Sequence, residues 1–340
     1  MGERGFDVAV VGATGAVGRE MLSVLEQREF PIANLRAMAS HRSAGRTLQC
    51  GGQSVVVEDL EEADFSGVDF ALFSAGSTVS RRHAQRAVDA GAVVIDNTSA
   101  FRMDAGVPLV VPEVNQQAAR DHRGIVANPN CSTIQMVVAL KPLVDQYGLE
   151  RVVVSTYQSA SGAGQSGVDE LMEGARAYIK GEQEPAPSTF AHPLAFEALP
   201  HIDVFDENGF TREELKMIRE TRKILDDPAL EISATCVRVP VLRCHSEAVT
   251  VDLGRAVDVD EIRQIWRDSD GVEVLDNPAS AQYPLSRPAT DTDPCWVGRI
   301  RRDLDRPQTL HFWVVSDNLR KGAALNAVQI AESFAVEDHS

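Results

Sequence analysis

One cysteine of the chain stands in a setting that favours a reactive thiol. Cys131 follows Asn128-Pro129-Asn130 and precedes the apolar, helix-compatible run 134–144. A thiol at a helix N-terminus has its thiolate stabilised by free backbone N–H groups and by the helix dipole, so its pKa falls. The same N–H groups suit an oxyanion that forms on a carbonyl oxygen. The pattern therefore predicts that Cys131 is a nucleophile that attacks a carbonyl carbon.

The other four cysteines stand outside such a setting. Cys50, Cys236 and Cys295 begin no predicted helix, and Cys244 lies in a strand-like region beside a histidine. The five cysteines include no Cys-x-x-Cys pair and are odd in number. We therefore expect neither a metal site nor a disulfide framework.

A glycine-rich segment near the N-terminus predicts a nucleotide-binding turn. Gly12-Ala13-Thr14-Gly15-Ala16-Val17-Gly18 lies between a predicted strand over 7–12 and a predicted helix over Ala16–Gln27. Glycines let the backbone turn tightly and approach a pyrophosphate, and the helix N-terminus adds N–H groups and partial positive charge. The spacing is GxxGxxG, so the prediction depends on the strand–turn–helix context as well. The expected cofactor contacts here are Gly12, Thr14, Gly15, Ala16 and Val17.

The end of the next predicted strand, 35–39, bears on the choice of cofactor. It is followed by Ser40-His41-Arg42-Ser43, which contains no carboxylate of the kind that binds the ribose of NAD. Arg42 can bind a 2′-phosphate through two hydrogen bonds, and Ser43 can add another. We therefore expect NADP as the cofactor.

A thiolate and a nicotinamide cofactor together predict redox chemistry of an aldehyde through a thioester. The thiolate adds to the aldehyde, hydride leaves to the nicotinamide, and water or phosphate then cleaves the acyl-enzyme. The hydride step needs a base for the hydroxyl proton. Position alone does not separate the candidate histidines, which are His41, His83, His122, His192, His201, His245, His311 and His339.

Seven motifs occur in one order that resembles the bacterial-type aspartate-semialdehyde dehydrogenases. They are the segments 12–18, Ser99-Ala-Phe-Arg102-Met, 128–133, Gln158-Ser-Ala-Ser-Gly-Ala-Gly164, Glu213-Glu-Leu-Lys216, Arg238-Val-Pro-Val-Leu-Arg-Cys-His245 and Asp317-Asn-Leu-Arg-Lys-Gly322, within a resemblance that spans residues 7–331. The resemblance implies NADPH-dependent reductive dephosphorylation of L-aspartyl 4-phosphate to L-aspartate 4-semialdehyde and phosphate. It implies a place in the biosynthesis of lysine, diaminopimelate, threonine and methionine.

The resemblance also implies a role for each matching residue. For catalysis it implies Cys131 as nucleophile, His245 as acid and base, Gln158 as orienting residue and Asn130 as support of the thiol. Substrate contacts would come from Arg238, Glu213 and Gln158, and phosphate contacts from Arg102 and Lys216. Cofactor contacts beyond the glycine-rich turn would come from Arg42, Ser43, Ser161, Gly162 and Asn318.

Three alternatives compete with this interpretation. N-acetyl-γ-glutamyl-phosphate reductases use the same thioester chemistry, but a Pro-Gly-Cys-Tyr-type turn is expected there instead of Pro129-Asn130-Cys131-Ser132. Glyceraldehyde-3-phosphate dehydrogenases usually carry a Ser-Cys-Thr-Thr-type turn, which this chain does not have around Cys131. A non-catalytic nucleotide-binding paralogue should have lost the thiol or the histidine, and this chain keeps both Cys131 and His245.

The spacing of predicted strands and helices indicates two domains. Up to about residue 130 they alternate, which predicts a Rossmann-type α/β domain with a mostly parallel sheet. Longer strands at 151–158, 232–241, 247–253 and 309–315, with helices near 166–180, 211–226 and 258–268, predict an α+β domain with a mixed, largely antiparallel sheet. We expect a nucleotide-binding domain of 1–130 and 319–340, and a catalytic and dimerisation domain of 131–318.

One helix start carries two of these candidates. Residues 211–214 form the capping-box pattern T-x-x-E, which places Glu213 and Lys216 on one helix face. From these residues alone, a solvent-exposed ion pair is the simpler interpretation of Glu213 and Lys216.

Composition excludes several classes of partner. The chain has 340 residues, with 50 acidic and 33 basic side chains and a net charge of −17. That balance argues against nucleic-acid binding, and no apolar run approaches the ~18 residues of a membrane span. The polar N-terminus leads directly into a strand-like segment, so we expect no targeting segment and a cytoplasmic protein. The expected partners are a small-molecule substrate, inorganic phosphate and a second copy of the chain.

Overall fold

A computed structural model of the chain describes residues 5–335, which divide into two compact units. The first unit holds the described residues up to Asn130 together with 323–335, and the second holds 131–322. The predicted division placed 319–322 with the nucleotide-binding domain, whereas these residues belong to the second unit. Residues 1–4 and 336–340 of the predicted domain, including His339, lie outside the described residues.

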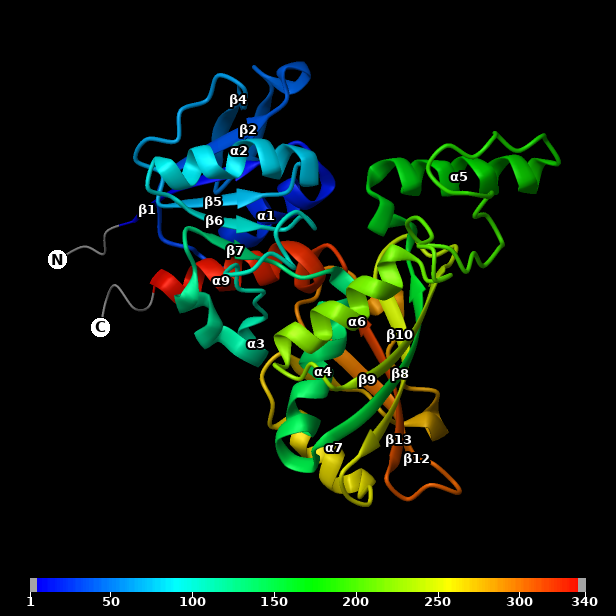
Figure 1. Ribbon diagram of the computed structural model, residues 1–340. Helices are drawn as coiled ribbons and strands as arrows, with labels where there is room; N and C mark the ends of the chain where they lie inside the picture. Colours follow the sequence, from blue (N-terminus) through cyan, green and yellow to red (C-terminus); the bar gives the residue numbers. More distant parts are fainter. Residues whose placement is uncertain (1–4, 336–340) are drawn as a thin grey trace. The chain divides into compact units, whose positions relative to one another are not determined.

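The first unit is built on a seven-stranded sheet in the order β3-β4-β2-β1-β5-β6-β7 (Figure 1). All neighbouring strands are parallel except β3 and β4. The strands are β1 (Phe6–Val11), β2 (Ile32–Ala39), β3 (Thr47–Cys50), β4 (Gln53–Asp59), β5 (Phe70–Phe73), β6 (Val93–Asp96) and β7 (Ile125–Ala127). The helices are α1 (Ala16–Gln27), α2 (Ser77–Asp89), the short α3 (Pro112–Asn115) and α9 (Leu325–Ala335).

The side chains of the central strand β1 alternate between two core clusters, one on each face of the sheet. Val8 and Val10 belong to a core cluster that also holds residues of α1 and α9. Ala9 and Val11 belong to the cluster on the other face, which holds residues of α2. Because successive strand residues point to opposite faces, one buried apolar strand packs against helices on both sides. The predicted parallel α/β sheet is confirmed.

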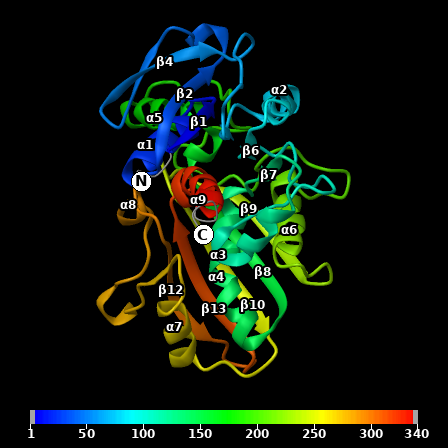
Figure 2. The same cartoon turned by 90° about the vertical axis from the view of Figure 1, so that its left-hand side faces the viewer.

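The second unit is built on a six-stranded sheet in the order β11-β12-β13-β10-β8-β9 (Figure 2). The two outer pairs, β11–β12 and β8–β9, are parallel and the inner pairs antiparallel, so the predicted mixed, largely antiparallel sheet is confirmed. The strands are β8 (Leu149–Gln158), β9 (Glu231–Arg238), β10 (His245–Leu253), β11 (Val272–Val274), β12 (Cys295–Arg302) and β13 (Thr309–Ser316). The helices are α4 (Cys131–Tyr147), α5 (Gln165–Lys180), α6 (Arg212–Ile224), α7 (Val259–Arg267) and the short α8 (Ser286–Ala289).

Some element predictions differ from the structure for physical reasons. The strand predicted over 232–241 ends at Arg238, because Pro240 has no N–H for a further ladder hydrogen bond. The strand predicted over 247–253 begins at His245. A π-helical turn at Arg320–Ala324 precedes α9. Strands β3, β4, β7, β11 and β12 were not predicted.

The β3–β4 hairpin could have been predicted from the two glycines of its turn. Gly51 and Gly52 connect the paired residues Cys50 and Gln53, and both glycines have positive φ, as two-residue hairpin turns require.

Within residues 5–335, no helix is long and apolar enough to cross a membrane.

Candidate active site

Four strands of the second unit bring polar side chains into one row at one end of the sheet. Ser316 of β13 pairs with His245 of β10, and Gln158 of β8 pairs with Arg238 of β9. The β8–β10 register pairs Glu247 with Thr156, which puts His245 and Gln158 on the same face. All members of this row are buried. The row lies at the end where β8, β9 and β13 terminate, and the next row on the same face adds the buried polar residues Glu247 and Thr156.

Cys131 is the first residue of α4, as the predicted helix start requires. Helix α4 packs over β8, β10 and β13, on the face that carries the polar row. Gly322 stands directly against this residue, because a Cβ at Gly322 would lie 2.9 Å from the Cβ of Cys131. A glycine at position 322 therefore keeps space beside the thiol.

His245 is held as a neutral imidazole. The backbone N–H of Ser159 donates to its Nδ1 at 3.0 Å, so in this arrangement the ring proton is on Nε2. Complete burial, together with the positive charge of Arg238, lowers the pKa of His245 to about 3. Its Nε2 has no hydrogen-bond partner among the described residues. That atom is the part of the ring left for a reacting group.

Arg238 supplies a buried positive charge beside that ring. Its Nη1 donates to the carbonyl oxygen of Ser159 at 2.6 Å. Burial lowers the pKa of Arg238, while the negative charges of Glu213 and of a Cys131 thiolate raise it. A Cβ at Gly162 would lie 2.6 Å from Arg238 Nη1 and 3.1 Å from His245 Nε2. Gly162 therefore leaves both groups accessible to a small anionic ligand.

Helix α6 contributes a carboxylate to the same site. Glu213 is buried, and its Oε1 accepts from Gln158 Nε2 at 3.1 Å. Its Oε2 accepts from Lys216 Nζ at 3.2 Å, and Lys216 also donates to Asp203 at 2.8 Å. The simple exposed ion pair expected from the helix pattern is therefore wrong for Glu213. The predicted capping box is confirmed, with Glu214 and Thr211 exchanging hydrogen bonds.

Of the residues predicted for catalysis and phosphate binding, Arg102 and Asn130 lie in the first unit. Arg102 is buried, and its guanidinium donates to the backbone carbonyls of Asn128 at 2.9 Å and Asn97 at 3.0 Å. Asn130 is also buried, directly before Cys131 in the chain. These contacts anchor Arg102 to the segment that leads to the cysteine.

The glycine-rich turn of the first unit has the geometry of a pyrophosphate cradle. Gly12 has a φ of +88°, and a Cβ there would lie 2.9 Å from the backbone nitrogen of Ala75. A Cβ at Gly18 would collide with the carbonyl oxygen of Gly12, and no side chain caps the first turn of α1. The backbone N–H groups of Ala16 and Val17 therefore remain open to an anion, whereas that of Gly15 donates to the carbonyl oxygen of Gly12 at 2.9 Å. The turn fits a dinucleotide.

The residues predicted to bind a 2′-phosphate follow the end of β2. Thr14 Oγ1 donates to Ser43 Oγ at 3.4 Å, which places the predicted 2′-phosphate residues beside the glycine-rich turn. Arg42 is exposed, and no ion pair within residues 5–335 involves it. Arg42 is therefore available to a phosphate.

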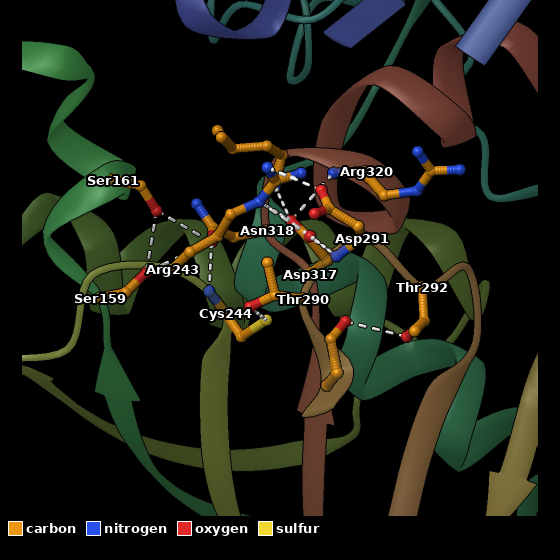
Figure 3. A network of polar contacts seen from close by, with 12 residues as sticks. Ser159, Ser161, Arg243, Cys244, Thr290, Asp291, Thr292, Asp317, Asn318 and Arg320 are labelled. Atoms are coloured by element: carbon orange, nitrogen blue, oxygen red, sulfur yellow. Dashed lines mark hydrogen bonds and ion pairs between the residues drawn. The ribbon is translucent and has the colours of Figure 1, made fainter. Parts of the chain in front are cut away.

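The remaining cofactor candidates lie in the second unit, in a polar network shown in Figure 3. Asn318 Oδ1 accepts from the backbone N–H of Cys244 at 2.9 Å, from Ser161 Oγ at 3.1 Å and from Ser159 Oγ at 3.2 Å. Asp317 is fully buried and accepts from Arg243 Nε at 2.9 Å. The network connects the end of β8 to the start of β10 and the end of β13.

Three residues near the site were not predicted from the sequence. Ser159 contacts His245, Thr156 donates to Gln158 Oε1 at 3.0 Å, and Glu247 lies buried on the same face of β10 as His245. A signal existed for Glu247, because a charged residue in an otherwise apolar, period-two strand is unusual. Ser159 lies inside the 158–164 motif, where nothing separates it from Ser161.

Two family models match the chain. The model described as "Semialdehyde dehydrogenase, NAD binding domain" matches residues 7–122, and "Semialdehyde dehydrogenase, dimerisation domain" matches residues 140–321. Together they cover most of both units.

Curated relatives and solved structures agree with these models. The aspartate-semialdehyde dehydrogenase of Aquifex aeolicus is 51% identical over 98% of this chain and 99% of its own length, and that of Bacillus subtilis is 50% identical over 97% and 98%. A crystal structure of aspartate semialdehyde dehydrogenase II from Vibrio cholerae, complexed with ASA, has a TM-score of 0.96 at 48% identity and covers 99% of this chain and 100% of that one. An enzyme of the same name from Candida albicans, solved with NADP, has a TM-score of 0.74 at 25% identity and covers 97% and 98%.

Proposed function

The chain belongs to the aspartate-semialdehyde dehydrogenase family, and we propose that it interconverts L-aspartyl 4-phosphate and L-aspartate 4-semialdehyde with NADP(H) through a thioester on Cys131. The observation that carries this proposal is the buried row of His245, Gln158 and Arg238 beneath the helix that begins with Cys131. Such a row combines a proton carrier, an amide and a carboxylate-binding cation around one nucleophile.

In the reductive direction the thiolate of Cys131 attacks the acyl carbon of the phosphorylated substrate. The carbon–sulfur bond forms, the carbon–oxygen bond to phosphate breaks, and a thioester remains on the cysteine. Backbone N–H groups in the first turn of α4 stabilise the oxyanion during this step. A bound nicotinamide cofactor supplies the hydride for the redox step.

His245 handles the proton of the redox step from its Nε2. In reduction it protonates the tetrahedral oxyanion on the former thioester carbon, which gives the hemithioacetal, and it takes that proton back as the hemithioacetal collapses to aldehyde and thiolate. In oxidation it removes the same hydroxyl proton. Burial and the positive charge of Arg238 both lower the pKa of His245, and a substrate carboxylate bound to Arg238 offsets the second of these effects. An anionic substrate therefore favours the protonated imidazole.

The other polar groups position the substrate. Arg238 binds the α-carboxylate through its planar guanidinium, and Glu213 binds the ammonium group. Gln158 is fixed by Thr156 and Glu213, so its amide is set in one orientation. Lys216 and Arg102 supply positive charge for the phosphate.

The cofactor is NADP in this proposal. The glycine-rich turn holds the pyrophosphate, and Arg42 with Ser43 binds the 2′-phosphate. The strand β2 ends without a carboxylate that would repel this phosphate.

A second copy of the chain completes the second unit in this proposal. Helices α4, α6 and α7 pack on the face of the sheet that carries the polar row. The opposite face presents Ser155, Tyr157, Ala248, Thr250 and Trp313, which are only partly buried, and Tyr157 is 40% exposed. A sheet face of this kind is covered in stable proteins. In a two-fold homodimer, this face of each subunit is covered by the same face of the other subunit.

One assay tests the proposed reaction. Purified protein is supplied with NADP, phosphate and aspartate semialdehyde, and formation of NADPH is followed; N-acetylglutamate semialdehyde is the matched alternative substrate. Rapid, phosphate-dependent turnover of the aspartate compound alone is expected. Preference for the N-acetylglutamate compound, or turnover that is independent of phosphate, would reject the proposal.

A further inference from the structure

Ser159 contacts the catalytic histidine through two different groups. Its backbone N–H donates to His245 Nδ1 at 3.0 Å, and its hydroxyl oxygen lies 3.1 Å from the same atom. The hydroxyl also lies 3.2 Å from Asn318 Oδ1 and 3.0 Å from Ser161 Oγ, as the dashed lines in Figure 3 show. The side chain of Ser159 is fully buried, so these groups are its environment.

The backbone contact alone suits only one state of the ring. An N–H group can only donate, so it leaves Nδ1 without a proton and puts the ring proton on Nε2. In that tautomer Nε2 can donate a hydrogen bond but cannot accept a proton from a hemithioacetal. The base form, and the cation that acts as acid, both carry a proton on Nδ1. Each of these forms therefore needs an acceptor there.

The hydroxyl of Ser159 is such an acceptor. It can receive a hydrogen bond from Nδ1–H and direct its own proton to Asn318 Oδ1. We propose that Ser159 is a positioning residue that, together with Asn318, allows His245 to carry a proton on Nδ1 and so frees Nε2 for the substrate proton. This inference rests on the proposed function and names a residue that the motifs left without a role.

The orientation of Asn318 supports this arrangement. Its Oδ1 receives the backbone N–H of Cys244, a buried residue with a φ of +72° directly before His245. Asp317, the preceding residue, is fixed by Arg243. The amide oxygen of Asn318 is therefore held toward the two serine hydroxyls, where it ends the chain of hydrogen bonds.

Other groups also face the ring and must be separated from the hydroxyl. Arg238 from β9 disfavours the cation, whereas Glu213 from α6 and the carbonyl of Cys244 favour it. None of these is altered by removing one hydroxyl. A Ser159→Ala variant therefore isolates the proposed contact, and Ser159→Thr restores it.

The test compares wild type, Ser159→Ala, Ser159→Thr and the control Ser269→Ala, whose hydroxyl donates to the carbonyl of Ile265 on α7. For Ser159→Ala we expect kcat to fall about 10- to 100-fold in both directions, with KM values within about twofold of wild type. The midpoint of the kcat–pH profile should shift as well. Ser159→Thr should recover most of kcat, and Ser269→Ala should match wild type.

Two further measurements exclude general damage and address the tautomer directly. Alkylation of Cys131 by iodoacetamide should proceed at the wild-type rate in Ser159→Ala. Nitrogen-15 NMR, with the His245 signals identified by their loss in His245→Gln, should show a smaller Nδ1–H population in Ser159→Ala than in wild type.

Each outcome decides the proposal. Wild-type kcat in Ser159→Ala, an unchanged tautomer population, or a kcat loss accompanied by altered Cys131 alkylation would overturn it. If wild type fails to turn over any semialdehyde, the proposed function falls, and the tautomer comparison still tests the role of Ser159 by itself.

Discussion

At the scale of single residues, Cys131 differs from the other cysteines in its exposure and in its place at a helix start. Cys50, Cys236, Cys244 and Cys295 are all buried, and burial raises the pKa of Cys236 above its ordinary range and that of Cys244 to about 12. Cys131 is partly exposed at a helix start. Iodoacetamide should therefore label Cys131 first, with activity lost in proportion to labelling. Mass spectrometry of the labelled peptides checks this order.

Replacement of the thiol gives the complementary result. Cys131→Ala should show no detectable turnover, and Cys131→Ser should lose most activity because a hydroxyl is protonated at neutral pH. His245→Ala should slow the redox step and leave a labelable thiol. Turnover of semialdehyde by Cys131→Ala would contradict the covalent mechanism.

Glu247 is a buried carboxyl whose protonation should be visible in stability. Complete burial raises its pKa well above the ordinary range, although the side chain of Gln135 opposes this. In the unfolded chain it ionises near pH ~4.3, so between that value and the raised one the folded state binds the extra proton. Folding stability is therefore lost as pH rises, by at most about 1.4 kcal/mol per pH unit.

Glu247→Gln should remove this slope. The difference in free energy of unfolding, variant minus wild type, should increase between about pH 5 and pH 8. Urea denaturation at several pH values measures it, and Glu62→Gln at an exposed position is the control. A difference that is constant with pH would show that Glu247 titrates normally.

Arg42 sets the cofactor preference by our interpretation. Arg42→Asp removes a charge-assisted contact and places a like charge against the 2′-phosphate. The KM for NADP should rise by the equivalent of about 1.5–3 kcal/mol, with a much smaller change for NAD. Steady-state kinetics with both cofactors test this, and equal effects on the two would show that Arg42 does not bind the phosphate.

At the scale of elements, the capping box of α6 links helix stability to substrate binding. Thr211→Ala removes the cap and should destabilise the protein by about 1 kcal/mol. Because α6 positions Glu213 and Lys216, the KM for the substrate should rise as well.

Asp258 offers a matched control, since its side chain caps α7 and that helix carries none of the predicted site residues. Asp258→Ala should cost a similar stability with the substrate KM unchanged. Thermal denaturation and steady-state kinetics distinguish the two variants. Equal substrate KM values in the two variants would show that the cap of α6 does not affect substrate binding.

At the scale of the whole molecule, the uncovered face of the second sheet should govern assembly. Ser155 and Ala248 are paired neighbours near the middle of that face. Ser155→Arg places a charge there and should shift a dimer toward monomer, because an unpaired charge in an interface is costly. Sedimentation at micromolar concentration measures the shift, and Ser54→Arg at an exposed position of the first unit is the control. Monomeric wild-type protein would contradict the proposed dimer.

The sequence by itself determined the elements whose information is local. The helix at Ala16–Gln27 was predicted with the observed bounds, because apolar periodicity and the preceding glycines mark it. Cys131 at a helix start and the capping box of Thr211 and Glu214 also follow from neighbours within a few positions. The family followed from the order of motifs along the chain.

Only the tertiary structure decided which distant residues meet. The pairing of β8, β9, β10 and β13 aligns Arg238, Gln158, His245 and Ser316 in one row. The partner and the register of each strand are not specified by the sequence of that strand alone. Burial turned Glu213 from an apparent surface residue into a partner of Gln158. The two contacts of Ser159 with His245 likewise arise where two strand ends converge. These relations are set by non-local packing, which composition, spacing and propensity do not encode.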